Sequence, residues 1–311
     1  MNAEQLLEHY DKVADAPDVV ARLRKFVLDL AVRGKLVEQD ANEPAATELL
    51  QQIIAHKRKT ASRKSTGSAA LKPVSPNLAP FELPSGWVCA KFGDIVISRD
   101  GERIPVSKEE RNGRAKVFDY YGASGVIDKI DAFLFDKPLL LIGEDGANLI
   151  NRSTPIAFIA RGKYWVNNHA HVLDGLSLEF LQYVELFINS TDLKPYVTGS
   201  AQPKMNQTKM NSIPVALPPL GEQKRILAKF DELMALCDRL EDARAEREAT
   251  RDRLAAASFA RLNAPDPDTF RADARFALSV LPDITARADQ IKQLRQTILN
   301  LAVRGKLVAQ D

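Results

Sequence analysis

A sequence of eighteen residues occurs twice in the chain, and this repeat constrains the fold more than any other feature. Residues 23–40 read LRKFVLDLAVRGKLVEQD, residues 294–311 read LRQTILNLAVRGKLVAQD, and 13 of the 18 positions match. The offset of 271 residues (294 − 23) is too long for a solenoid or propeller repeat. A repeat with this spacing brackets a domain, and it predicts one surface, made twice, that meets one partner or itself in two equivalent places.

Each copy of the repeat predicts a helix, a tight stop and an apolar hook. Arg33 and Arg304 fall in the last turn, where a cation suits the negative end of the helix dipole. Gly34 and Gly305 supply the residue that tolerates a positive φ beyond a helix end. Apolar residues at helical spacing share one face: Leu23, Phe26, Val27, Leu30 and Ala31 in the first copy, and Leu294, Ile298, Leu301 and Ala302 in the second. The larger of them are candidate partner or dimer contacts: Leu23, Phe26, Leu30, Leu294, Ile298 and Leu301.

Composition excludes several classes of protein. A net charge of +2 over 311 residues makes no polycation, so any nucleic-acid surface must be local. Two cysteines form no disulfide framework and fit a reducing cytosol. The N-terminus carries no secretory signal, and no stretch approaches the roughly 18 apolar residues of a membrane span. We therefore expect a cytoplasmic protein that has no membrane contact.

Changes of composition along the chain predict four parts and an α+β fold. Residues 1–40 are an N-terminal helical repeat, and residues 41–82 are a short helix followed by a flexible basic linker. Residues 83–217 form one globular α/β domain, in which short β-type runs alternate with glycine-rich turns and a helix covers 178–190. Residues 218–311 form a helical spacer that ends in the second copy of the repeat.

The spacer is predicted as a long antiparallel helical hairpin. Its first helix covers residues 222–262, and the sequence NAPDPD at 263–268 reverses the chain. A second helical stretch then runs through Ile291 to the terminal repeat. The first helix carries a coiled-coil-like seam with alternating spacings of four and three: Ile226, Phe230, Leu233, Cys237 and Leu240. All of these except Cys237 are further candidate partner or dimer contacts.

No enzymatic motif is found in the sequence. It contains no P-loop, nucleophile elbow or dinucleotide-binding fingerprint. The prolines at 218 and 219 are followed by Leu220 and not by an aromatic residue, so the Asn/Asp-Pro-Pro-Tyr/Phe motif of amino-methyltransferases is missing as well. We therefore expect a protein without catalytic residues or a cofactor of its own.

Three strings in this sequence resemble the specificity (S) subunits of type I restriction–modification systems. They are residues 120–149 (YYGASGVIDKIDAFLFDKPLLLIGEDGANL), 164–173 (YWVNNHAHVL) and 198–241, which begins TGSAQPKMNQTKMNSIPVALPPLGEQKR. The AVRGKLV repeats and LPSGW at 83–87 fit the same family. The resemblance implies a target-recognition domain that reads half of a split site in double-stranded DNA. It also implies helical regions that hold methyltransferase (M) subunits, which bind S-adenosylmethionine, and a restriction (R) translocase–nuclease subunit as a further partner.

The sequence departs from the family pattern in one respect, because a full family member carries two recognition domains and this chain carries one. Two explanations remain open. The chain is the front half of a longer protein, or it is a half-length subunit that forms a homodimer. Either way, the second recognition domain comes from elsewhere.

Cations near residue 100 are the first candidate DNA contacts: Arg99, Arg103, Lys108, Arg111, Arg114 and Lys116. Each phosphate contact would release counterions. Four acidic residues interrupt these cations, so a solvated loop of mixed charge is an equal alternative.

The polar sequence GSAQPKMNQTKMN at 199–211 is the second candidate. Amides of Gln202, Asn206 and Gln207 can pair with adenine edges, and Lys204 and Lys209 can reach phosphate or guanine. The alternative is a polar loop that precedes a helix.

Shorter segments supply the remaining candidate contacts: Tyr121, Ser124, Asn148, Asn168 and His169. For Tyr121, packing within the domain is the favoured alternative. His169 and His171 would share one face of a strand, yet no Cys or carboxylate cluster lies beside them in the sequence, so we expect hydrogen bonding and no metal site.

The sequence thus favours a non-catalytic DNA-reading subunit. The rival interpretation is a helical scaffold or interaction protein whose α/β domain does not read DNA. Salt-dependent binding to duplex DNA separates the two, since a groove reader loses affinity steeply with salt.

Overall fold

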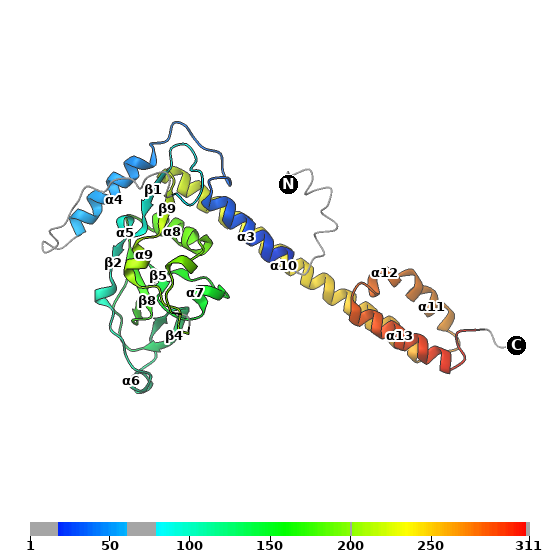
Figure 1. The fold of residues 1–311 in the computed structure, drawn as a ribbon. Coiled ribbons are helices and arrows are strands. Elements are labelled where there is room, and N and C mark those ends of the chain that lie inside the picture. The colour runs from blue at the N-terminus through cyan, green and yellow to red at the C-terminus, as the bar shows by residue number, and fades with distance from the viewer. Residues whose placement is uncertain (1–17, 61–78, 200, 309–311) are drawn as a thin grey trace. The chain divides into compact units, whose positions relative to one another are not determined.

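The computed structural model describes residues 18–60, 79–199 and 201–308 and confirms an α+β fold with one long helix (Figure 1). The chain forms two compact units, residues 1–234 and 235–311, and helix α10 (Leu220–Asn263) begins in the first and ends in the second. This division is coarser than the four predicted parts. The helix expected before residue 18 and the linker at 61–78 lie outside the described residues.

Three small sheets build the first unit. The two-stranded sheet pairs β1 (Val88–Lys91) with β9 (Pro214–Leu217), and Val88 lies opposite Leu217. The four-stranded antiparallel sheet has the order β2 (Ile97–Ser98), β8 (Ala170–Asp174), β5 (Leu139–Gly143) and β6 (Ala157–Ala160). The three-stranded sheet has the order β4 (Gly125–Ile130), β3 (Phe118–Gly122) and β7 (Tyr164–Val166), with β3 and β7 parallel.

Strand β5 is apolar throughout because both faces of its sheet are covered. Leu140 and Ile142 belong to the main core, and Leu139 and Leu141 belong to a second cluster on the opposite face. Helix α8 (Leu178–Ser190) packs on β5 and β6, and the hydroxyl of Ser177 caps it by accepting the N–H of Phe180.

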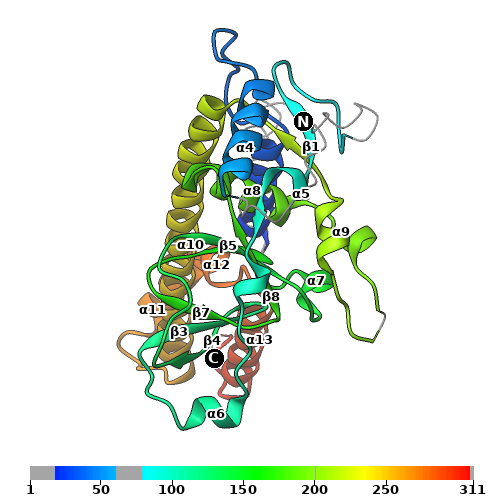
Figure 2. The ribbon, with the colours of Figure 1, turned by 90° about the vertical axis from the view of Figure 1, so that its left-hand side faces the viewer.

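Two helices from the N-terminal part of the sequence complete this unit. Helix α4 (Ala46–Thr60) lies over the short helix α5 (Phe92–Ile95), and its residues Leu49, Leu50 and Ile53 join the main core (Figure 2). Helix α3 (Val19–Val32) packs on α8 and runs antiparallel to the first part of α10. This direction follows from two contacts: Arg24 approaches Met234, whereas Glu43, beyond the end of α3, pairs with Arg225 near the start of α10.

The predicted antiparallel hairpin is wrong for the second unit. The chain returns along α10 through α11 (Phe270–Ser279) and α12 (Leu281–Ile284), and Arg261 pairs with Asp273 at 2.9 Å. Residues 285–287 then turn it again, so α13 (Ala288–Val303) runs parallel to α10. The order of contacts gives the direction, since Gln290 binds Asp252 and Asn300 binds Asn263. These three short helices lie around the last part of α10 in Figure 1.

The two copies of the repeat share a conformation and differ in surroundings. Gly34 and Gly305 have φ values of 66° and 64°, as the predicted helix stops require. Val32 is 4% exposed in the first unit, whereas its counterpart Val303 is 89% exposed in the second. In the first copy a Cβ added to Gly34 would lie 2.7 Å from Pro84 and 2.8 Å from Trp87. The first copy is therefore seated against the segment LPSGW, while the second is open at the equivalent face.

Several short elements escaped the sequence analysis. Strand β4 reads GVIDKI and is largely exposed, so it lacks the apolar run that marks its neighbours. Helices α6 (Lys108–Asn112), α7 (Asn148–Asn151) and α9 (Gln207–Asn211) have four or five residues each, too few for a helical period to be visible. Among the described residues, no helix has the length and apolar content to cross a membrane.

Candidate nucleic-acid interface

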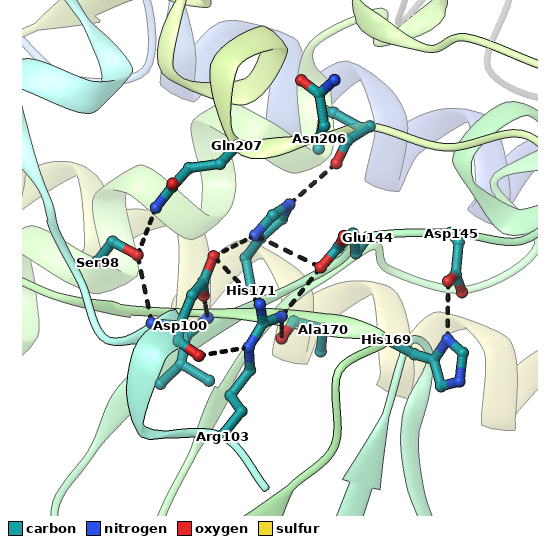
Figure 3. Close-up of polar contacts among 12 residues, drawn as sticks. Ser98, Asp100, Arg103, Glu144, Asp145, His169, Ala170, His171, Asn206 and Gln207 are labelled. Atoms are coloured by element: carbon teal, nitrogen blue, oxygen red, sulfur yellow. Dashed lines mark hydrogen bonds and ion pairs between the residues drawn. The ribbon is translucent and has the colours of Figure 1, made fainter. Parts of the chain in front are cut away.

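Four polar segments that are distant in the sequence meet at one end of the four-stranded sheet (Figure 3). The 3-10 turn at Asp100–Glu102 follows β2, the turn at 144–146 follows β5, residues 167–169 precede β8, and residues 203–207 lead into α9. We call their meeting point the polar cluster, and it consists of Asp100, Arg103, Glu144, His171 and Lys204.

His171 is at the centre of the polar cluster and is 1% exposed. Its Nδ1 lies 2.7 Å from a carboxylate oxygen of Asp100, and its Nε2 lies 2.9 Å from the carbonyl oxygen of Met205. The other carboxylate oxygen of Asp100 accepts the N–H of Val172 at 2.8 Å. The ring therefore links the strand β8 to both the turn after β2 and the segment before α9.

Cations balance the two carboxylates of the polar cluster. The guanidinium of Arg103 donates to Glu144 at 3.0 Å and to the carbonyl of Ala170 at 2.7 Å, and Nζ of Lys204 lies 3.2 Å from Glu144. Burial alone would raise the pKa of both carboxyls. Several hydrogen bonds and nearby positive charges, among them the bonds between His171 and Asp100 and between Arg103 and Glu144, together outweigh burial and hold each pKa below its usual range. Both carboxyls are thus ionised at neutral pH.

Backbone hydrogen bonds fix the segment that precedes α9. Thr198 and Lys204 exchange two of them at 2.8 Å each, and the N–H of Met205 donates to the carbonyl of Glu144 at 2.8 Å. Gly199 has a φ of 84°, and an added Cβ would lie 2.5 Å from the carbonyl oxygen of Gln202. The turn therefore requires glycine at this position.

Exposed amides and one lysine follow this fixed turn. Gln202 and Lys209 are exposed, the side chain of Asn206 caps α9 by accepting the N–H of Lys209, and Gln207 donates to Ser98 Oγ at 2.7 Å. The predicted alternative for this segment, a polar loop before a helix, also describes its structure. Its side chains nevertheless remain at the surface, on a rigid base.

His169, Asn168 and Asn148 lie near the same end of the sheet. His169 is half-exposed and pairs with Asp145 at 2.7 Å, and Asn168 beside it is exposed. The amide of Asn148 is engaged within its own loop, where it binds Ser153 and Thr154. Of these three residues, Asn168 and His169 point outward from the sheet end, while Asn148 stabilises α7.

The cations predicted between residues 99 and 116 are largely paired with acids. Arg99 binds Asp174 at 2.7 Å together with Lys137, and Arg103 belongs to the polar cluster. Arg111 and Lys116 both bind Asp128 at 2.9 Å, and Arg114 binds Asp131. Lys108, at the start of α6, is exposed. The two hydrogen bonds from Lys116 and Arg111 hold the pKa of Asp128 well below its usual range.

This pairing places the cations in three groups. Arg103 lies in the polar cluster at one end of the four-stranded sheet, whereas the guanidinium of Arg99 binds Asp174 at the opposite end of β8. Arg111, Arg114 and Lys116 lie against the three-stranded sheet, where Arg111 stacks 4.4 Å from the ring centre of Tyr120. Ser124 is exposed in the turn between β3 and β4. Tyr121 is half-buried between Phe158 and Tyr164, as the packing alternative predicted, and burial raises its pKa.

The candidate partner contacts differ in accessibility. Ile226 is fully buried in the core of the first unit, Phe230 packs against that core, and Leu301 is 7% exposed in a cluster of the second unit. Phe26 and Ile298 remain 56% and 44% exposed. The others are partly buried: Leu23, Leu30, Leu233, Leu240 and Leu294.

Sequence reasoning missed the residues that organise this surface. In the sequence, Asp100 is one of the four acids that interrupt the cations, Glu144 is not singled out, and His171 is expected only to be hydrogen-bonded. The signal was the alternation of acids and bases after residue 98, which the structure turns into ion pairs across segments. In the described ranges, no group of three or more His, Cys, Asp or Glu side chains could hold a metal ion.

Comparison with known proteins assigns a family to this arrangement. The sequence profile described as "Type I restriction modification DNA specificity domain" matches residues 84–248, more than half of the chain. The chain belongs to this family. The matched residues include all three sheets, the polar cluster and the beginning of α10.

Curated relatives extend the match across the specificity-domain chain. The chain is 31% identical over 318 residues to the type I restriction enzyme EcoEI specificity subunit of Escherichia coli. This match covers 94% of the chain and 52% of that protein. It is 30% identical over 320 residues to the EcoAI specificity subunit of the same organism, with 94% and 53% covered. The chain thus spans about half the length of the curated relatives it matches.

Two solved structures are also similar to this specificity-domain chain. A chain from work on complex assembly and conformational transition of the type I R-M system has a TM-score of 0.43 and 16% identity, and the match covers 82% of this chain and 57% of that one. The type I restriction-modification S subunit from M. genitalium has a TM-score of 0.40 and 14% identity, with 80% and 57% covered.

Proposed function

We propose that this chain is the DNA-recognition component of a type I restriction–modification complex, that it reads one half of a bipartite target, and that it performs no chemistry itself. The family match over residues 84–248 carries this proposal. The methyltransferase subunits would supply S-adenosylmethionine and modify an adenine flipped out of the duplex. A restriction subunit would join the same assembly.

We propose the end of the four-stranded sheet as the DNA-facing surface. Gln202, Asn206, Gln207 and Asn168 would read base edges, because amides can pair bidentately with adenine. Their exposure on a backbone fixed by the 144–146 turn supports this assignment. Lys108, Lys204 and Lys209 would contact phosphates, since each is exposed.

The paired arginines would act in a different way. Four arginines are paired with carboxylates of the same domain: Arg99, Arg103, Arg111 and Arg114. They would set the shape and charge of the surface, whereas the lysines would carry most of the salt dependence. Lys116 and His169, which are half-exposed, would contact the backbone at the edge.

The second half of the target would be read by a second recognition domain at the second copy of the repeat. Its open face, with Val303 89%, Leu307 51% and Val308 75% exposed, supports this proposal, since the first copy covers its own face with Pro84 and Trp87. That domain would come from a continuation of a longer chain or from a second copy in a homodimer.

Co-expression of the chain with its neighbouring methyltransferase subunit, followed by sequencing of host DNA for N6-methyladenine, tests the proposal. A new split motif is expected. The double substitution Gln202→Ala and Gln207→Ala should abolish or relax the motif, whereas Gln51→Ala and Gln52→Ala, on the exposed face of α4, should leave it unchanged. The absence of any new methylated motif, together with salt-independent or absent binding to duplex DNA, would favour a scaffold instead.

A further inference from the structure

The buried ring of His171 makes two hydrogen bonds that a neutral histidine cannot make together. Its two nitrogens face Asp100 Oδ2 at 2.7 Å and the carbonyl oxygen of Met205 at 2.9 Å. An ionised carboxylate and a carbonyl both only accept, so each ring nitrogen has to donate. A neutral imidazole carries one N–H and an imidazolium carries two. The geometry therefore calls for the charged ring.

The groups that surround the ring provide for that charge. Asp100 reaches it from the turn after β2, and Glu144 at the end of β5 lies 3.9 Å from Nδ1. Arg103 pairs with both of these carboxylates, and Lys204 pairs with Glu144. A buried cation is stable where it is paired and hydrogen-bonded. The ring of His171 is paired with Asp100 and is also hydrogen-bonded to the carbonyl of Met205.

The hydrogen bond to Met205 acts on the segment proposed to read bases. Met205 is fully buried, and both of its backbone polar groups are hydrogen-bonded. Its N–H donates to the carbonyl of Glu144, and its carbonyl oxygen faces the His171 ring. Asn206 and Gln207 follow at once, at the start of α9. A shift of the Met205 peptide would move these two side chains directly, and a misplacement of about 1 Å is enough to weaken bidentate recognition.

We propose that His171, as an imidazolium that bridges Asp100 and the Met205 carbonyl, is a positioning residue that holds segment 202–207 in register for base reading. The inference rests on the proposed function, because it takes this segment as the base-contacting one. His171 itself touches no base, since it is buried. Without either of its two hydrogen bonds, the ring would no longer link the turn after β2 to the segment before α9.

The charge of the ring can be measured without DNA. In the full chain with ¹⁵N-labelled histidine, the two ring nitrogens of His171 are expected to give the shifts of a doubly protonated ring. The spectrum of His171→Gln identifies the signal among the four histidines of the chain. A neutral His171 ring at pH 7 would overturn the proposal whatever the chain binds.

The positioning role is tested in the complex with the methyltransferase subunit. His171→Gln should weaken binding to a duplex carrying the methylated motif by at least about tenfold and leave binding to an unrelated duplex nearly unchanged. His56→Gln, on α4 and outside the polar cluster, is the matched control.

Two further outcomes keep the interpretation clear. If His171→Gln unfolds the domain, Asp100→Asn is the second variant, because it keeps the ring and removes the charge partner, with the same loss of motif preference expected. Equal loss of affinity for both duplexes, or unchanged affinity for the motif, would overturn the positioning role. A wild-type complex without any motif preference would instead overturn the proposed function, while the ring spectrum would still report the charge of His171.

Discussion

Gly34 and Gly305 occupy equivalent positions of the repeat, but the repeat is buried around Gly34 and exposed around Gly305. Both adopt a positive φ, so a side chain costs about 1 kcal/mol of backbone strain at either one. At Gly34 a Cβ would also collide with Pro84 and Trp87, the latter a rigid buried ring. We expect Gly34→Ala to lower the free energy of unfolding of the first unit by about 3 kcal/mol.

Gly305→Ala is the internal control for this substitution and should cost about 1 kcal/mol. Trp87 and Trp165 are the two tryptophans of the chain, and both lie in the first unit, so their fluorescence during urea unfolding reports that unit alone. Circular dichroism reports the helices of both units, so a transition that it shows and fluorescence does not belongs to the second. Equal costs at the two glycines would show that the contact with Pro84 and Trp87 is not tight.

Glu185 on α8 should make the stability of the first unit depend on pH near neutrality. Burial raises the pKa of this carboxyl to about 7, with Arg161 and Asp231 adding smaller opposing effects. The folded state then binds the proton more tightly than the unfolded state, so stability falls as the pH rises from about 4.5 to 7. Glu185→Gln should stabilise the unit on the order of 2 kcal/mol at pH 8 and have little effect at pH 4.

Urea unfolding at the two pH values measures this difference. Glu82→Gln, at an exposed glutamate of the same unit, should change neither value. A gain of equal size at both pH values would mean that the amide packs better, and not that the carboxylate is strained by burial.

Residue types in the candidate site could be predicted from the sequence, but their partnerships could not. The amides at 202–207 are exposed as a recognition segment requires, and His171 is hydrogen-bonded as expected for a histidine without metal-ligand neighbours. Arg103 and Glu144 are 41 residues apart, and no local pattern indicates that they form a pair. Ion pairs across a sheet depend on strand register, which is set by the whole core.

Helix α13 makes polar as well as apolar contacts with α10. The amide of Asn263, at the end of α10, donates to the hydroxyl of Thr297 at 3.0 Å and accepts from Asn300 at 2.9 Å. Thr297 is 1% exposed, so removal of the amide leaves a buried hydroxyl without this partner. We expect Asn263→Ala to lower the free energy of unfolding of the second unit by about 1–2 kcal/mol.

Thermal unfolding followed by circular dichroism measures this cost. Gln293→Ala, on the exposed face of the same helix, is the control and should stay within about 0.5 kcal/mol of wild type. A neutral result for Asn263→Ala would imply that α13 is held by its apolar contacts alone, through Leu294 and Leu301.

The extent of long elements was predictable and their direction was not. Helix α8 has the predicted bounds, and α10 begins two residues before the predicted helix, because each shows a sustained helical period. The parallel course of α13 follows from the extra turn at 285–287, after the short return helices α11 and α12 of ten and four residues. Tertiary packing, which a single sequence does not display, decides such reversals.

At the scale of the molecule, the proposed function implies that the length of α10 sets the gap between the two halves of the DNA target. Duplication of residues 241–247 adds seven residues, or about 10.5 Å of helix, and keeps the helical phase to within about 20°. The gap between the two halves of the methylated motif should lengthen by roughly three base pairs at about 3.4 Å each, and the bases within each half should stay the same.

Motif sequencing in the co-expressing host measures both quantities at once. The substitution Glu246→Ala, which keeps the length of α10, should leave the gap unchanged. A change in the bases of either half after the duplication would contradict the separation of reading from spacing.

The pairing of β1 with β9 has a further consequence for the molecule as a whole. Because Val88 lies opposite Leu217, the polypeptide enters and leaves the globular domain at neighbouring points. Just outside these points, the indole N–H of Trp87 donates to Glu222 of α10 at 2.9 Å. A domain whose two ends meet behaves as an insert in the helical frame. The residues between β1 and β9 can then be replaced by a divergent domain whose ends also meet. The DNA target would change, while the helices on either side of the domain stay the same.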